Sequence, residues 1–199
     1  HPMQSKELNS LTKPTNGKNE VNLAFDIEAN GIDSTKIHCI VIQDIDSGIV
    51  EEYNDEKYCD DPKELPMSSY SLTTALTTLM CASNIVSHNG IHYDVPQLQK
   101  HYPFFRELNA KHWDTLILSR YFHPNLYDID KKRNWPMMPA RLYGSHSLEA
   151  WGYRLKCHKD DFGKTTDWAE WSPEMQEYCK KDVAVLVKLW HHFQKYLSQ

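Results

Sequence analysis

Two acidic side chains, Asp26 and Glu28, stand two residues apart in a stretch that alternates apolar and polar residues. On a β-strand such residues project from the same face, with Cα atoms roughly 6.5 Å apart. Two carboxylates there repel each other, and burying them without counter-charge is unfavourable. A pair of hard divalent cations resolves such repulsion and supports hydrolytic chemistry. The alternative is a strand end whose two acids face water, which is where most acids lie.

Two further acids have a distinctive setting. Asp182 lies one turn after Tyr178, within an apolar stripe at helical spacing, so its charge is expected to face inward. A buried carboxylate is costly unless it binds a metal or pairs with a Lys or Arg, and both remain open. Asp94 precedes Pro96 and is expected to be the N-cap of a helix; one oxygen could cap while the other binds metal.

Strands and helices must position these acids. A period-2 pattern predicts a strand at 21–28, and further strands are expected at 37–44 and 49–53 and, as a short buried strand, at 84–87. The turn 46–48 makes the second and third strands an antiparallel hairpin. Helices are predicted at 71–81, 94–101, 115–121 and 147–155. The last and longest helix begins at Ser172-Pro173-Glu174 and runs to about Tyr196. Segments 58–69 and 123–144 are predicted to be loops, and the length of the second suggests a functional role. This order indicates an α/β fold, a mixed sheet with helices on both faces.

The composition fits one soluble domain: 199 residues with a net charge of −5. This charge argues against a protein that coats nucleic acid, but not against an enzyme that grips a few terminal nucleotides. Five cysteines without a CxxC pair predict neither a disulfide framework nor a thiolate zinc site, which favours a reducing cytoplasm. Neither a membrane span nor a signal peptide is expected. Residues 1–20 are predicted to be a flexible tail and residues 21–199 the folded domain.

The order of the acidic motifs resembles that of the DnaQ-like, or DEDD, 3′→5′ exonucleases, whose fold is ribonuclease H-like. The motifs are Asp26-x-Glu28, Asn89-x3-Tyr93-Asp94 and Tyr178-x3-Asp182. Longer stretches are similar to one subgroup, the proofreading exonuclease domain of short-tailed bacteriophage family A DNA polymerases: 25–31, 88–96, 114–120, 144–155 and 159–162. The resemblance runs from about residue 21 to the C-terminus. Tyr178, four residues before Asp182, marks the tyrosine subtype (DEDDy). The stretch between Phe162 and Trp171 looks shorter than in the phage polymerases.

The resemblance implies a function and a set of site residues. Asp26, Glu28, Asp94 and Asp182 would hold two Mg²⁺ or Mn²⁺ ions, and Tyr178 would orient the attacking water. The substrate would be a DNA 3′ end, single-stranded by preference, and the products nucleoside 5′-monophosphates, as in proofreading or DNA processing. Asn89 would contact the substrate or brace the strand. Ile32 would be an apolar wedge against the terminal base, with core packing as the equal alternative.

Several alternatives stay open. An RNA-trimming exonuclease of the same fold would carry the same motifs, and a retired nuclease serving as a binding module is disfavoured because all the site residues are present. A polymerase domain or subunit is a possible partner, because the chain could be free-standing or part of a polymerase. Asp114 is expected to be an N-cap rather than a fifth ligand. Lys131-Lys132-Arg133 could touch DNA phosphates, although such runs are usually only solvated.

Overall fold

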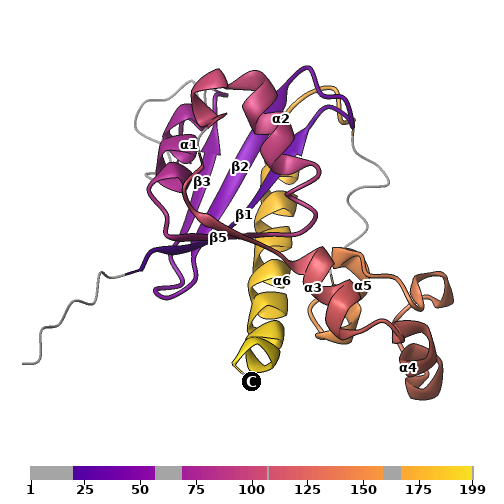
Figure 1. The fold of residues 1–199 in the computed structure, drawn as a ribbon. Coiled ribbons are helices and arrows are strands. Elements are labelled where there is room, and N and C mark those ends of the chain that lie inside the picture. Colours follow the sequence, from indigo (N-terminus) through magenta and orange to yellow (C-terminus); the bar gives the residue numbers. More distant parts are fainter. Residues whose placement is uncertain (1–19, 57–68, 107, 159–166, 199) are drawn as a thin grey trace, which may run out of the picture.

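The structure is a computed structural model that describes residues 20–56, 69–106, 108–158 and 167–198. Its centre is a six-stranded sheet in the order β4-β3-β2-β1-β5-β6 (Figure 1). The strands are β1 (Asn22–Ala29), β2 (Ile37–Asp44), β3 (Val50–Asn54), β4 (Ser69–Tyr70), β5 (Asn84–Ser87) and β6 (Lys111–Asp114). The β1–β2 and β2–β3 pairs are antiparallel, whereas β1–β5, β5–β6 and β3–β4 are parallel. The predicted mixed sheet and its hairpin are confirmed.

Helices cover both faces of the sheet, as predicted. Helices α1 (Leu72–Met80) and α2 (Asp94–His101) lie on one face, and α6 (Pro173–Leu197) crosses the other (Figure 1). Along β1, Leu23, Phe25 and Ile27 pack into the core on the α1 and α2 side, whereas Ala24 packs into the core below α6. Because successive side chains on a strand alternate between faces, Asp26 and Glu28 project toward α6.

The remaining helices form a group beside the C-terminal half of α6. They are α3 (Thr115–Phe122), α4 (Leu126–Arg133) and α5 (Leu148–Arg154), and Figure 1 shows them beyond the β5 side of the sheet. An apolar cluster of Leu126, Trp151, Leu189 and Phe193 joins them to α6. Two short 3₁₀ helices, η1 (Pro103–Arg106) and η2 (Ala140–Leu142), lie in the connections.

The helix starts follow the local sequence signals. The side chains of Ser71, Ser147 and Ser172 accept hydrogen bonds from backbone N–H groups in the first turns of α1, α5 and α6. Pro173 occupies the first turn of α6, where its missing N–H leaves no helical bond unmade. These predicted boundaries are confirmed within one or two residues.

The prediction of an irregular loop at 123–144 is wrong, because α4 and η2 lie inside it. Among the residues of α4 only Leu126 and Asp130 are buried, so the helix has no apolar stripe for a periodicity to detect. Two edge strands were also missed. Strand β6, with the sequence Lys-His-Trp-Asp, is short and mostly polar, and the two-residue β4 includes Ser69, the last residue of the predicted 58–69 loop.

Three sequence expectations fall outside the described residues: the flexible tail, except Glu20, residues 58–68 of the loop predicted at 58–69, and the phage-like stretch 159–162. Among the described residues, no helix combines the length and apolarity required to cross a membrane.

Candidate active site

The four predicted acids converge on one cavity of about 300 Å³ between the end of β1, the start of α2 and the first half of α6. Asn89 and Tyr178 line the same cavity, so six of the seven residues singled out from the sequence are brought together. The lining is completed by Ile27, His88, Tyr93, Leu148, Glu149 and Trp168.

Asp26 and Glu28 do not form a solvated strand end. Asp26 is partly buried and Glu28 is only 9% exposed, beneath α6. On that helix the Cys179 Sγ lies 3.5 Å from the backbone oxygen of Asp26 and 3.8 Å from its Oδ2. A carboxylate oxygen of Asp26, a carboxylate oxygen of Glu28 and the Sγ of Cys179 all lie within 4.8 Å of one another. Strand and helix therefore confine two carboxylates to the space of a single ion.

Asp94 has a different role from the expected one. Tyr93, not Asp94, is the N-cap of α2, and it makes no side-chain capping bond. Asp94 is the first residue of the helix, is 4% exposed, and its buried Oδ2 has no hydrogen-bond partner. Burial and the nearby charges of Asp26 and Glu28 raise the pKa of Asp94 well above its ordinary value. A buried carboxylate oxygen without a hydrogen-bond donor, next to other carboxylates, is a position that a cation would fit.

The turn before α2 is built to place Asp94. The buried carboxylate of Asp114 accepts hydrogen bonds from the N–H groups of Asn89 (2.9 Å) and Ile91 (3.2 Å). It also accepts one from Leu116 N, so Asp114 is the N-cap of α3, as predicted. Asn89 is in the left-handed region, with φ of 62°, and a side chain at Gly90 would meet Ser87 and come within 3.1 Å of Asp94 Oδ2. The backbone contact of Asn89 thus braces the turn next to the acids.

Tyr178 and Asp182 reach the cavity from successive turns of α6. Asp182 is 7% exposed, which confirms that it faces inward. The Tyr178 ring meets Trp168 edge-to-face, with centroids 6.3 Å apart. Burial, followed by the charges of Glu28 and Asp26, raises the pKa of Tyr178 to about 12. Its hydroxyl is therefore a protonated hydrogen-bond donor at neutral pH.

Sequence reasoning missed Cys179, His88, Glu149 and Trp168. Cys179 is fully buried, and burial, a hydrogen bond with Cys39 and nearby negative charge raise its pKa well above the ordinary value. It therefore stays a thiol, suited to donate toward Asp26 rather than to bind metal as a thiolate. Its position one residue after Tyr178 was the available signal. His88 and Glu149 lie within the phage-like stretches, whereas no sequence signal pointed to Trp168.

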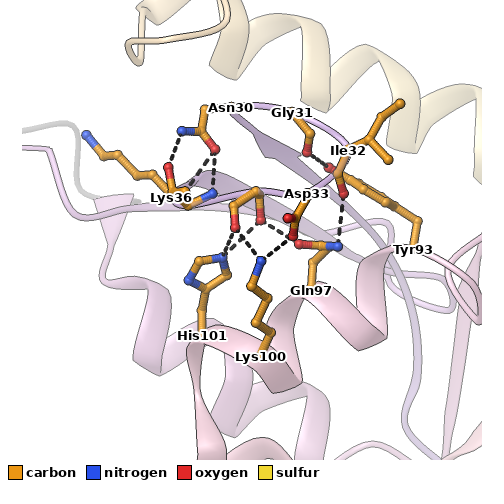
Figure 2. A network of polar contacts seen from close by, with 11 residues as sticks. Asn30, Gly31, Ile32, Asp33, Lys36, Tyr93, Gln97, Lys100 and His101 are labelled. Atoms are coloured by element: carbon orange, nitrogen blue, oxygen red, sulfur yellow. Dashed lines mark hydrogen bonds and ion pairs between the residues drawn. The ribbon is translucent and has the colours of Figure 1, made fainter.

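Ile32 lies outside the cavity lining, on the connection between β1 and β2. Its side chain is 89% exposed, so the core-packing alternative is wrong. Figure 2 shows the connection tied down on both sides of Ile32 while its side chain stays outside the network. Tyr93 Oη donates to Gly31 O (2.7 Å) and Gln97 Nε2 to Ile32 O (3.1 Å), and Lys100 binds Asp33 and Ser34 O. The backbone holds an apolar side chain in water at a fixed position.

Known proteins share the sequence and the fold. The DNA-directed DNA polymerases of Enterobacteria phage T3 and Escherichia phage T7 are each 34% identical to this chain, over 186 and 187 residues. The alignments cover 82% of this chain and 25% of each polymerase, so the chain spans about a quarter of the length of these curated relatives. The expected similarity to phage polymerases is confirmed.

Solved structures of Brucella melitensis NrnC, one with bound Mg²⁺ and one bound to pGG, match with a TM-score of 0.56. They are 17% identical and cover 90% of this chain, with 75% of the Mg²⁺-bound NrnC chain and 74% of the pGG-bound one, which shows a shared fold. The model of the RNase H superfamily matches residues 23–194. The comparisons support a nuclease, and the chain belongs to the RNase H superfamily.

Proposed function

We propose that this chain is a metal-dependent 3′→5′ exodeoxyribonuclease of the DEDDy type. The observation that carries the proposal is the buried, hydrogen-bond-free Oδ2 of Asp94 beside Asp26 and Glu28. With Asp182 and Tyr178 in the same cavity, the arrangement calls for divalent cations and places a hydroxyl donor beside them.

The donor set fits Mg²⁺ or Mn²⁺. Asp26, Glu28 and Asp182 would hold one ion, and Asp26 with Asp94 a second. Carboxylate oxygens are the ligands that these hard ions prefer, and the Cys179 sulfur beside Asp26 is a protonated thiol. When bound, the ions would lower the pKa of a water toward neutrality and balance the charge of the phosphate.

The protein's own groups position the reactants. Tyr178 keeps its proton, with a pKa of about 12, so its hydroxyl can orient a water by a hydrogen bond rather than act as a base at neutral pH. The edge-to-face contact with Trp168 limits the freedom of the Tyr178 ring. Asp114 fixes the turn that carries Asn89, whose side chain borders the cavity and would contact the terminal nucleotide.

The features around the cavity favour an unpaired DNA end. Ile32 is exposed on a braced connection, as required of a side chain that packs against a base. Admitting a duplex end requires base pairs to separate, and a chain whose net charge is −5 gains little from phosphate contacts to offset the free energy of that separation. The phage polymerase relatives support DNA as substrate, a proofreading role, and a polymerase domain or subunit as partner.

A degradation assay on matched single-stranded oligonucleotides tests the proposal. We expect no activity in EDTA, recovery with Mg²⁺ or Mn²⁺, and release of nucleoside 5′-monophosphates. A blocked 3′ end should stop degradation, whereas a blocked 5′ end should not. Undiminished activity in EDTA would contradict the proposed metal-dependent mechanism. Faster degradation of an RNA oligomer than of the matched DNA would instead favour the RNA-trimming alternative.

A further inference from the structure

The segment that follows Asp130 has an unusual charge distribution. Residues 131–148 contain four Lys or Arg side chains and no Asp or Glu, in a chain whose net charge is −5. The four cations are Lys131, Lys132, Arg133 and Arg141, and all are exposed. Lysines and arginines at the end of α4 also complement the helix dipole. That preference does not explain why acids are missing from the rest of the segment.

A buried carboxylate holds this segment in place. Asp130 is fully buried and accepts hydrogen bonds from Arg154 Nε (3.1 Å) and Nη2 (2.7 Å), both on α5. It also accepts one from Trp135 Nε1 (2.9 Å) and one from Gly144 N (2.8 Å). One side chain therefore ties α4 and the two ends of the following connection to α5. The adjacent lysines are displayed on a fixed frame rather than on a loose loop.

Exposed apolar and aromatic surface lies among the cations. Tyr127 is 55% exposed, and the Lys131 Nζ lies 5.6 Å from the centre of its ring. The guanidinium of Arg133 lies 5.1 Å from the Trp135 ring, and Met137 is 69% exposed. Proteins commonly bind single-stranded nucleic acid with aromatic rings that stack on the bases and neighbouring cations that contact the phosphates.

The segment is continuous with the rim of the active-site cavity. Arg141 Nη2 lies 2.8 Å from Oε1 of Glu149, and Glu149 and Leu148 line that cavity. In Figure 1, α4 and α5 lie together to one side of α6, away from the sheet. A strand whose end occupies the cavity can therefore pass Arg141 and continue onto α4.

We propose that Tyr127, Lys131, Lys132, Arg133, Trp135 and Arg141, termed the α4 surface, bind the single strand that trails behind the nucleotide in the cavity. The proposal rests on the exonuclease function above and adds the path of the strand. It predicts a length preference: strands too short to reach α4 gain nothing from it. The occupant is nucleic acid because the surface pairs clustered cations with the exposed ring of Tyr127 and the partly exposed ring of Trp135, which match phosphates and bases together.

Binding of a labelled twelve-nucleotide single-stranded DNA, measured by anisotropy in the Asp182→Ala background, tests the proposal. The double variant Lys131→Ser/Lys132→Ser should weaken binding about tenfold and reduce the salt slope by about 1.4, the value for two phosphate contacts on a single strand. On a dinucleotide the loss should be much smaller. Lys188→Ser/Lys195→Ser removes the same charge from exposed positions of α6 and should bind like the background protein.

Equal binding by the two double variants would overturn the proposal, and so would a loss of the same size on both substrate lengths. Thermal melts of the variants confirm that each is folded. Failure of this proposal and failure of the proposed function can be told apart, since a failed exonuclease assignment would appear as wild-type protein that hydrolyses no strand with metal present. If the α4 surface binds a polymerase domain instead, DNA affinity will not change on substitution.

Discussion

Tyr178 and Asp182 share a helix face and a cavity, but their chemistry differs. Asp182 supplies a buried carboxylate, whereas Tyr178 supplies a hydroxyl that stays protonated. Under the proposed mechanism the first holds metal and the second positions water. Substitutions at the two positions should therefore have different effects on metal binding and on the rate of cleavage.

We predict that Asp182→Ala loses Mn²⁺ affinity and turnover together, because it deletes a ligand, with losses of several orders of magnitude. Tyr178→Phe keeps the ring and removes one hydroxyl, so it should slow cleavage about 10–10³-fold while metal binding stays near wild type. Mn²⁺ titration and single-turnover cleavage measure both quantities. Equal weakening of metal binding in the two variants would contradict the assignment.

Sequence reasoning succeeded for Asp182 and failed for the local role of Asp94. The apolar residues around Asp182 recur at helical spacing, and this spacing identifies the buried face of the helix from the sequence alone. Asp94 was expected to cap α2, as an aspartate before a first-turn proline commonly does. Its real setting depends on Asp114, twenty positions later, which holds the turn at Asn89 and Ile91. Contacts at that distance in the chain leave no local pattern.

At the scale of elements, a contact between residues distant in the chain also explains why α4 could not be predicted. The helix is fixed by a buried ion pair between Asp130 and Arg154, whose side chains are 0% and 4% exposed. Neither residue signals its partner in the sequence. Helix α6, by contrast, buries an apolar stripe under the sheet and begins at a serine and a proline, so its start and its inward face could be predicted.

We predict that Asp130→Asn destabilises the protein by about 3 kcal/mol, because removing one member of a buried pair leaves the other charge uncompensated. Asp128→Asn, on the exposed side of the same helix, should change stability by less than about 0.5 kcal/mol. Urea unfolding of the two variants makes the comparison at equal loss of charge. Equal stabilities would show that the Asp130–Arg154 pair does not anchor α4.

At the scale of the whole molecule, the active site opposes folding when no metal is bound. Burial and, after it, repulsion by the neighbouring carboxylates disfavour the charged form of Asp94 in the folded protein, and both raise its pKa. A cation that binds only the folded protein reverses this effect, and the gain in stability follows its concentration relative to its dissociation constant.

We therefore predict that Asp94→Asn is more stable than wild type in EDTA, because it removes a carboxylate that is disfavoured by burial and by its acidic neighbours. On addition of Mn²⁺, wild type should gain more melting temperature than the variant, which has lost a ligand. Thermal melts across a Mn²⁺ titration test both parts. A variant less stable than wild type in EDTA would mean that Asp94 is ionised and favourably paired without metal.

A partly buried histidine gives the metal-free protein a second dependence on pH. His88 contacts Thr115 Oγ1 at 2.8 Å, and burial lowers its pKa to about 4. Between that value and the unfolded pKa of about 6.5, the unfolded chain binds more protons, so stability falls as the pH falls. The contribution is complete above about pH 6.5. Asp94 works in the opposite direction, since its pKa is raised and the folded state takes up its proton first.

The two effects are separated by comparing wild type with His88→Asn, because the carboxylates are present in both proteins and their contribution cancels in the difference. Asn places a polar atom near the position of Nδ1, so the contact with Thr115 can be kept while the titrating ring is lost. Between pH 7.5 and pH 5, in EDTA, wild type should lose about 2 kcal/mol more unfolding free energy than the variant, as the two pKa values require. Urea unfolding at each pH measures this loss. Parallel stability profiles would show that His88 does not have its depressed pKa in solution, and a steeper profile for the variant would show that the folded protein stabilises the charged imidazole.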